Sequence, residues 1–87
     1  MKYAIFFSKQ AEKDKTLIKQ AALEEKVITL LARISENPFQ PPYVKEVGNL
    51  AGFFSRRITL QHRLVYEVLE EEKAIKILRM WTHHEHI

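Results

Sequence analysis

Hydrophobic and polar positions follow two different periods along the chain, and each change of period marks a predicted element. Residues 2–7, KYAIFF, are apolar and rich in aromatic and branched side chains, which is typical of a buried strand. From Ser8 onward the apolar positions, Leu17 and Ile18 among them, follow helical spacing, and Ser8 is a suitable N-cap. The pattern therefore predicts a strand followed by a helix that begins after Ser8.

A second helix is predicted between Leu23 and Ser35, where apolar side chains recur at helical spacing and form one stripe. No helix-breaking residue separates it from the first, so the two stretches form either one bent helix or a hairpin jointed near Ala21–Ala22. We favour the hairpin. Asn37 precedes Pro38, and the residue before a proline is pushed out of the helical region, so the second helix ends there.

The stretch from 37 to 52 contains all three prolines and both glycines of the chain, which predicts a long irregular loop. Long loops in compact domains are usually functional or disordered, and the apolar side chains of this one favour order. The remainder is strand-like, with strands expected at 53–60, 62–69 and 74–84 and a turn at 70–73. Short links between these strands predict an antiparallel meander.

This order of elements predicts an α+β fold in one domain over residues 1–87, with an N-terminal strand and two helices packed on an antiparallel sheet of about four strands. The absence of cysteine excludes a disulfide scaffold, a thiol nucleophile and a cysteine zinc site, and it suits a reducing compartment. The chain has no apolar run of membrane-spanning length and no signal-peptide pattern. We therefore expect a cytoplasmic protein with no membrane partner.

The chain is mildly basic, with a net charge of +3, which fits an anionic partner without establishing one. The distribution is more informative, since four of the five arginines and all four histidines lie in the last 32 residues. Strand parity puts Arg79, Trp81 and His83 on one face of the last strand. Arg63 begins the preceding strand and Arg56–Arg57 lie on the one before, so these side chains should gather at one end of the sheet.

Such a cluster suits RNA chemistry. A guanidinium binds phosphate and stabilises a phosphoryl transition state, and a histidine donates a proton to a leaving oxygen. Plain structural interpretations stay open: Trp81 as a core side chain rather than a base-stacking platform, and Arg56–Arg57 as a solvated strand face. The spacing of His83, His84 and His86 near a chain end is poor geometry for zinc, so we expect no metal and no other cofactor.

Three motifs resemble one known family: NPF at 37–39, GNLAGFFSRRITLQHRLVYEV at 48–68 and ILRMWTHH at 77–84. They are similar to the Txe/YoeB toxins of bacterial toxin–antitoxin modules, in the RelE-like superfamily, over about half the chain. The resemblance implies an endoribonuclease that cuts mRNA in the ribosomal A site by 2′-hydroxyl attack, without metal, and so inhibits translation. It also implies an antitoxin partner with an acidic C-terminal segment, and it makes a homodimer an open expectation.

The resemblance implies roles for individual residues. The family's transition-state arginine falls on Arg63 and its general-acid histidine on His83, in agreement with the cluster derived from strand parity. The family's general base, a glutamate, falls on Val44. The nearest carboxylate is Glu46, which in an extended segment points to the same side about 6–7 Å away, so Glu46 is either the replacement base or a solvated charge. His84 replaces the family's tyrosine after the histidine.

Three functions are open at this point. The first is an active ribosome-dependent nuclease, and the second is a catalytically weakened relative, blunted by Val44, that binds antitoxin or ribosome without efficient cleavage. The third is a generic RNA-binding domain, which would bind naked RNA tightly with a steep salt dependence, and a charge of only +3 argues against it. We expect an acidic antitoxin segment either to cover Arg57, Arg63 or His83 or to shift the terminal strand. The expected RNA contacts are Arg57, Arg56, His84, Trp81 and Lys45.

Overall fold

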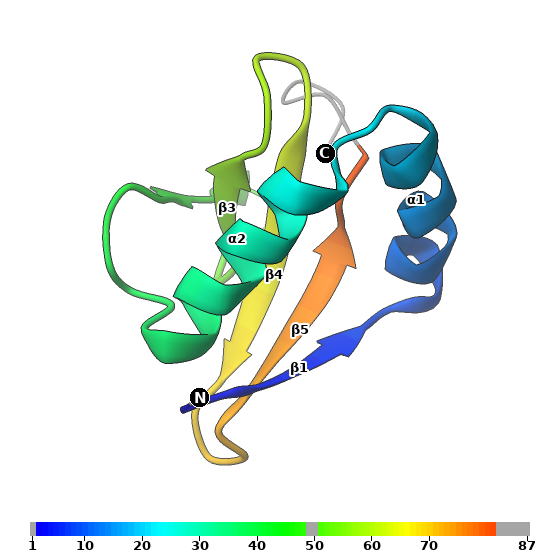
Figure 1. The fold of residues 1–87 in the computed structure, drawn as a ribbon. Coiled ribbons are helices and arrows are strands. Elements are labelled where there is room, and N and C mark those ends of the chain that lie inside the picture. Colours follow the sequence, from blue (N-terminus) through cyan, green and yellow to red (C-terminus); the bar gives the residue numbers. More distant parts are fainter. Residues whose placement is uncertain (1, 49–50, 82–87) are drawn as a thin grey trace.

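The computed structural model describes residues 2–48 and 51–81. Its elements follow in the order β1 (Ala4–Phe7), α1 (Lys9–Gln20), α2 (Glu24–Glu36), β2 (Val44–Lys45), β3 (Phe54–Arg57), β4 (Arg63–Leu69) and β5 (Ala74–Arg79). The strands form one sheet in the spatial order β1-β5-β4-β3-β2 (Figure 1). The α+β class and the predicted order of strand, two helices and strands are confirmed. Neither helix in this part of the chain is long and apolar enough to cross a membrane.

The sheet is mixed rather than antiparallel throughout. β1 runs parallel to β5, with Ala4 opposite Ala74 and Phe7 opposite Ile77, and the other neighbouring strands are antiparallel. The chain between β1 and the meander includes both helices, which is enough length for the parallel arrangement. The sheet also has five strands rather than about four, because Val44–Lys45, inside the predicted loop, pairs with β3.

The two helices form the hairpin that we favoured over one bent helix. The Oγ of Ser8 accepts a hydrogen bond from the backbone N–H of Ala11 at 3.0 Å, which confirms Ser8 as the N-cap of α1. α1 ends at Gln20, and Ala22 has a φ of 58°, a left-handed conformation that reverses the chain before α2. α2 ends at Glu36, directly before the Asn37-Pro38 pair.

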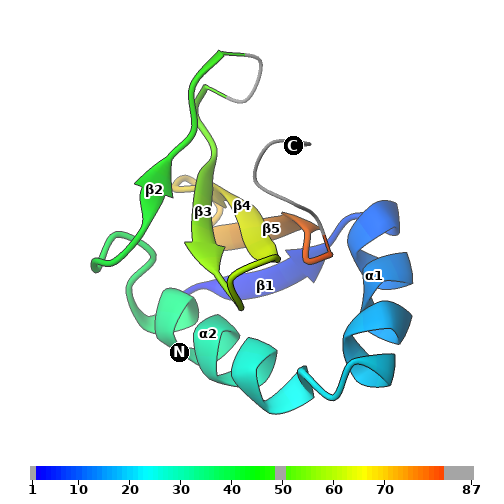
Figure 2. The ribbon, with the colours of Figure 1, turned by 90° about the horizontal axis from the view of Figure 1, so that it is seen from above.

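The core lies between the helices and one face of the sheet (Figure 2). Ile34 of α2 and Ile75 and Ile77 of β5 are completely buried there, and Val27 continues the predicted apolar stripe of α2. The opposite face of the sheet carries neither helix, and we call it the helix-free face. Because strand residues alternate between faces, half of the side chains of β3 and β4 point toward this second surface.

Contacts to the core order the described part of the long loop. The Phe39 and Tyr43 rings meet the Phe54 ring edge to face at centroid distances of 5.7 and 5.5 Å. The hydroxyl of Tyr66 donates a hydrogen bond to the carbonyl oxygen of Pro38 at 2.7 Å. These contacts confirm, for the described residues, the expectation that the loop is ordered.

The last strand is shorter than predicted. β5 ends at Arg79 instead of reaching residue 84, and residues 82–84 lie outside the described part of the chain. Within β5 the pairing with β4 shifts: Val65 is opposite Arg79, whereas Tyr66 is opposite Ile77, so Leu78 has no partner residue. Such a bulge re-aims the side chains that follow it, which strand parity read from the sequence does not foresee.

Candidate functional site

The helix-free face carries two arginines side by side at one end of the sheet. Arg57 of β3 is paired directly with Arg63 of β4, and directly paired residues point to the same face. Arg57 is exposed and Arg63 is half-buried. Like charges in this position are destabilising, so the pair costs stability that an anion bound between the two guanidinium groups would offset. The structure thus brings together two of the arginines that strand parity had grouped.

A carboxylate lies next to this pair through a hydroxyl bridge. The Oγ of Ser55 donates a hydrogen bond to Oε2 of Glu46 at 2.6 Å, and Nη1 of Arg63 donates to the same Oγ at 3.2 Å. Glu46 is half-buried, and its backbone N–H continues the β2–β3 ladder by donating to the carbonyl of Phe53 at 2.9 Å. Ser55 therefore joins the candidate base to the candidate transition-state arginine, a link that the sequence analysis missed.

The backbone of β2 explains why Glu46 reaches this position. Val44 is opposite Ser55 in the β2–β3 pair, so residues 44 and 46 both lie on the Ser55 side of the sheet. The Val44 side chain is 42% exposed next to Ser55. Lys45 alternates with them and lies on the opposite side, next to Phe54, which separates it from Glu46. Of the two interpretations of Glu46, the geometry favours a side chain that belongs to the site over a solvated charge.

A third arginine comes from a helix. Arg33 of α2 joins Arg57, Arg63, Tyr43 and Val44 around a hollow of about 210 Å³. Arg33 and Arg57 also line a second hollow of about 390 Å³, together with residues of the first turns of α2. We call Arg33, Arg57 and Arg63 the arginine cluster. The sequence offered no signal for Arg33, because it is an ordinary polar position on α2 that only the packing of α2 beside β3 brings to the site.

Arg56 requires a correction. Adjacent strand residues face opposite sides, so Arg56 points into the core, where it is only 4% exposed. Its Nε donates to the Tyr66 hydroxyl at 3.3 Å, and its Nη2 donates to the carbonyl oxygen of Gln40. The prediction that Arg56 contacts RNA is therefore wrong: this side chain ties the long loop to β3 and β4. Arg57, its neighbour, is the exposed member of the pair.

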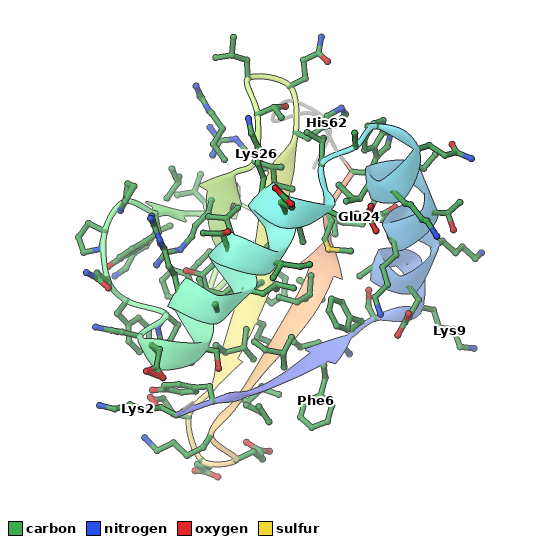
Figure 3. All side chains as sticks on the ribbon, viewed as in Figure 1. Lys2, Phe6, Lys9, Glu24, Lys26 and His62 are labelled. Atoms are coloured by element: carbon green, nitrogen blue, oxygen red, sulfur yellow. The ribbon has the colours of Figure 1, made fainter. Side chains whose placement is uncertain are left out.

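Arg79 makes an ion pair that strand parity did not predict. Its Nε bonds Oδ2 of the buried Asp14 of α1 at 3.0 Å, while its backbone is paired with Val65, which is paired in turn with Ser55 of β3. Trp81 is half-buried and stacks on His62 with ring centroids 3.9 Å apart, so it combines a packing role with a partly exposed ring. This stack, together with Lys26 at the start of α2, lines a third hollow of about 480 Å³. Figure 3 shows Lys26 and His62 at the same end of the molecule.

Two candidate residues, His83 and His84, lie outside the described residues, and so does His86. Within residues 2–48 and 51–81, no three histidine, aspartate or glutamate side chains come together as metal ligands. The described site is therefore a carboxylate, a hydroxyl and a set of guanidinium groups. That combination can bind a phosphate group and accept a proton close to it.

Comparison with solved structures first defines the class of protein. The YoeB toxin from Staphylococcus aureus is 34% identical, and alignments cover 97% of this chain and 100% of that one. The TM-score is 0.82 for its dimer and 0.79 for its complex with YefM. A YoeB/ParE toxin from Agrobacterium tumefaciens aligns with a TM-score of 0.84 at 25% identity, over 93% of this chain and 99% of its own. The fold is that of bacterial toxins of the RelE and YoeB type.

Sequence comparison then gives the family. The family described as "YoeB-like toxin of bacterial type II toxin-antitoxin system" matches residues 6–84. Toxin YoeB from Escherichia coli K12 is 38% identical over 72 residues, which is 78% of this chain and 76% of that protein. The chain belongs to the YoeB-like toxins of bacterial type II toxin–antitoxin systems, and the resemblance seen in its motifs is confirmed.

Proposed function

We propose that this toxin is a ribosome-dependent endoribonuclease that cleaves mRNA in the A site without a metal ion and so inhibits translation. The observation that carries the proposal is the hydrogen-bonded series Glu46, Ser55 and Arg63 on the helix-free face. It sets a proton acceptor beside a phosphate-binding cation, and those are two of the three groups that 2′-hydroxyl attack requires.

The reaction assigns one step to each group. The Glu46 carboxylate takes the proton of the 2′-hydroxyl, whose oxygen forms a bond to the adjacent phosphorus. Arg63, assisted by Arg57, stabilises the extra negative charge on the phosphoryl oxygens. His83 donates a proton to the 5′-oxygen as its bond to phosphorus breaks, leaving a 2′,3′-cyclic phosphate and a 5′-hydroxyl. Ser55 orients the Glu46 carboxylate and keeps it from pairing directly with Arg63, which leaves an oxygen free for the substrate proton.

The shape of the site supports dependence on the ribosome. The hollow beside Arg63 is only about 210 Å³, too small to hold and orient several nucleotides by itself. The net charge of +3 likewise supplies little affinity for free RNA. A ribosome that holds mRNA in a fixed path would provide the orientation that the toxin lacks. We therefore place the activity in the cytoplasm, where the translating ribosomes are.

An antitoxin and a second copy of the toxin are the proposed protein partners. The YoeB toxin of Staphylococcus aureus has been solved as a dimer and in complex with YefM. The arginine cluster gives an acidic disordered segment a complementary surface, and a segment that folds there would block phosphate binding. We propose that the antitoxin of this toxin covers Arg57 and Arg63 in that way.

The decisive experiment is cleavage of mRNA in a reconstituted translation system, mapped by primer extension, with naked mRNA as a control. Glu46→Gln and His83→Ala should each lower the cleavage rate by about 10²–10⁴-fold. Glu71→Gln, the same chemical change at an exposed turn position, should leave it unaltered. Folded wild-type protein that makes no cuts would overturn the proposal and leave antitoxin binding without catalysis.

A separate experiment tests which position of β2, 44 or 46, can supply the catalytic carboxylate. Val44→Glu in the Glu46→Gln background puts a carboxylate at the family's usual position, on the same side of β2. Recovery of cleavage would show that either position can deliver the carboxylate to the same substrate proton. Full activity of Glu46→Gln alone would show that Glu46 is not the base.

A further inference from the structure

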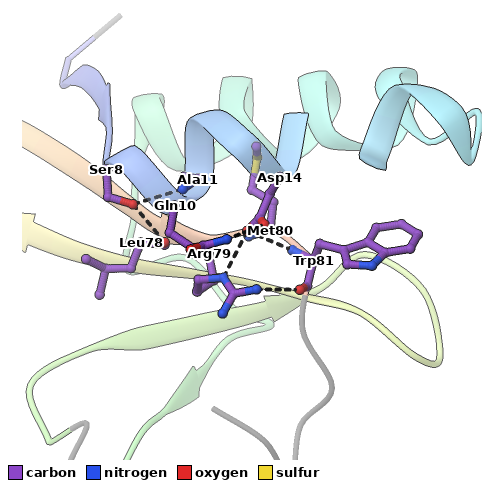
Figure 4. Close-up of polar contacts among 8 residues, drawn as sticks. All are labelled: Ser8, Gln10, Ala11, Asp14, Leu78, Arg79, Met80 and Trp81. Carbon is purple, nitrogen blue, oxygen red and sulfur yellow. Dashed lines mark hydrogen bonds and ion pairs between the residues drawn. The ribbon is translucent and has the colours of Figure 1, made fainter. Parts of the chain in front are cut away.

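Asp14 is a buried carboxylate that the proposed chemistry does not use. It lies on α1 with a side chain that is 1% exposed, facing the end of β5 (Figure 4). Its Oδ2 accepts three hydrogen bonds, from Nε of Arg79 at 3.0 Å and from the backbone N–H groups of Met80 at 2.9 Å and Trp81 at 3.3 Å. Its Oδ1 accepts a fourth, from Nε2 of Gln10 at 3.3 Å.

These hydrogen bonds lie at and just beyond the end of β5. β5 ends at Arg79, so the N–H groups of Met80 and Trp81 take no part in the β4–β5 pairing. Asp14 satisfies both of them, and Nη2 of Arg79 donates to the carbonyl oxygen of Trp81 at 2.9 Å. One carboxylate and one guanidinium therefore fix the backbone of two successive residues beyond the strand.

The first turn of α1 holds the preceding residue as well. The Oγ of Ser8, the N-cap, donates to the carbonyl oxygen of Leu78 at 2.8 Å, and Leu78 is the bulged residue of β5. α1 and its N-cap thus contact every residue from 78 to 81. Ser8 bonds residue 78, and Asp14 bonds the three residues that follow it. Burying the Asp14 carboxylate costs desolvation energy. Three of the hydrogen bonds that offset this cost come from residues 79–81.

We propose that Asp14 is a positioning residue: by fixing the backbone of Met80 and Trp81 it sets where the chain leaves β5, and so affects the step that we assign to His83. The inference rests on the proposed function, because His83 is the general acid only if the protein cleaves RNA. His83 follows Trp81 by two residues, and two trans peptide units span at most about 7.6 Å. A fixed Trp81 backbone therefore limits the region that His83 can reach, and a displaced one moves that region.

The first readout is optical and independent of activity. Trp81 is the only tryptophan of the chain, so its fluorescence reports on this segment alone. In Asp14→Ala, Trp81 emission should shift to longer wavelength and acrylamide should quench it more strongly, while far-UV circular dichroism stays native. The matched control is Glu12→Ala, which removes an exposed carboxylate that lies two residues earlier on α1 and pairs with Lys15. Unchanged Trp81 emission in folded Asp14→Ala would overturn the proposal.

The second readout asks whether Asp14 acts through His83. Misplacing a catalytic group by about 1 Å costs roughly 10²-fold in rate, so Asp14→Ala should lower kcat by that factor while ribosome binding is retained. In the His83→Ala background the same substitution should have almost no further effect, since the group that it positions is gone. Fully additive losses would show that Asp14 has a purely structural role and would overturn the proposal.

Two safeguards keep the outcomes distinct. If Asp14→Ala does not fold, Arg79→Ala removes the partly exposed partner of the same ion pair and takes its place in both readouts. If the wild type makes no cuts, the proposed function fails and the role of His83 fails with it. The Trp81 emission still decides, in that case, whether Asp14 fixes the chain beyond β5.

Discussion

Two adjacent arginines on β3 should respond in opposite ways to the same substitution. Arg56 is 4% exposed and hydrogen-bonded inside the fold, whereas Arg57 is exposed on the helix-free face beside Arg63. We predict that Arg56→Ala destabilises the protein strongly, and that Arg57→Ala leaves stability nearly unchanged but weakens cleavage. The pair is its own control, because residue type, strand and chain neighbours are shared.

The magnitude follows from the bonds that are lost. The Arg56 guanidinium donates to the Tyr66 hydroxyl and to the carbonyl oxygens of Gln40 and Pro38, the last at 3.5 Å and therefore weak. Two effective bonds to a charged group are worth about 1.5–3 kcal/mol each. Relief of the desolvation of a buried guanidinium offsets part of that sum, which leaves a loss of about 3 kcal/mol.

Thermal and urea unfolding followed by circular dichroism measure both variants. For a domain of this size each kcal/mol shifts the melting temperature by about 4–8 °C, so Arg56→Ala should lower it by roughly 12–24 °C. Arg57→Ala should stay within about 0.5 kcal/mol of the wild type, as exposed substitutions usually do. Equal losses in the two variants, or a loss below about 1 kcal/mol for Arg56→Ala, would refute the assignment of the two side chains to opposite faces.

Three further predictions follow from the same geometry. Ser55→Ala removes the hydroxyl that orients Glu46, so kcat in ribosome-dependent cleavage should fall roughly 10²-fold with ribosome binding unchanged; an unaltered kcat would count against the bridge. The bonds from Met80 and Arg79 outweigh burial and hold the pKa of Asp14 below its usual range, so its contribution to stability is complete above about pH 4 and is lost as pH falls through the folded-state pKa. Acid titrations of the unfolding free energy should therefore show the wild type and Asp14→Asn converging at low pH, and a constant difference would contradict this. Arg33→Gln should weaken ribosome binding and reduce its salt dependence by about one ion, whereas Lys13→Gln on α1 should do neither, which cosedimentation at graded salt would measure.

The sequence alone predicted both helices and four of the five strands in their order, because local chemistry sets these elements. Ser8 caps a helix wherever a helix follows it, and the Asn37-Pro38 pair ends one regardless of what packs nearby. The period of the apolar residues separated strands from helices for the same reason. The motifs also identified the family, and with it the positions of Arg63 and His83 as candidate catalytic residues.

The tertiary structure decided which of these residues meet. β1 lies parallel to β5, and residues 44 and 45 form a strand, only because distant segments offer them partners. The bulge at Leu78 shifts the register so that Arg79 lies opposite Val65, and Asp14 of α1 forms an ion pair with its guanidinium. Such pairings depend on residues far apart in the chain, so no local pattern encodes them.

In the candidate site, too, the sequence indicated the residue types and the tertiary structure decided which of them come together. The sequence analysis grouped Arg56 with Arg57, although neighbouring residues of a strand face opposite sides. Which of the two faces the core depends on where Tyr66 and the loop carbonyls lie. The approach of Glu46 to Arg63 depends on the short β2 pairing and on Ser55. Residue types and spacing thus named the chemistry, while long-range packing selected the side chains that stand together, because a hydrogen bond or an ion pair requires contact within a few ångströms.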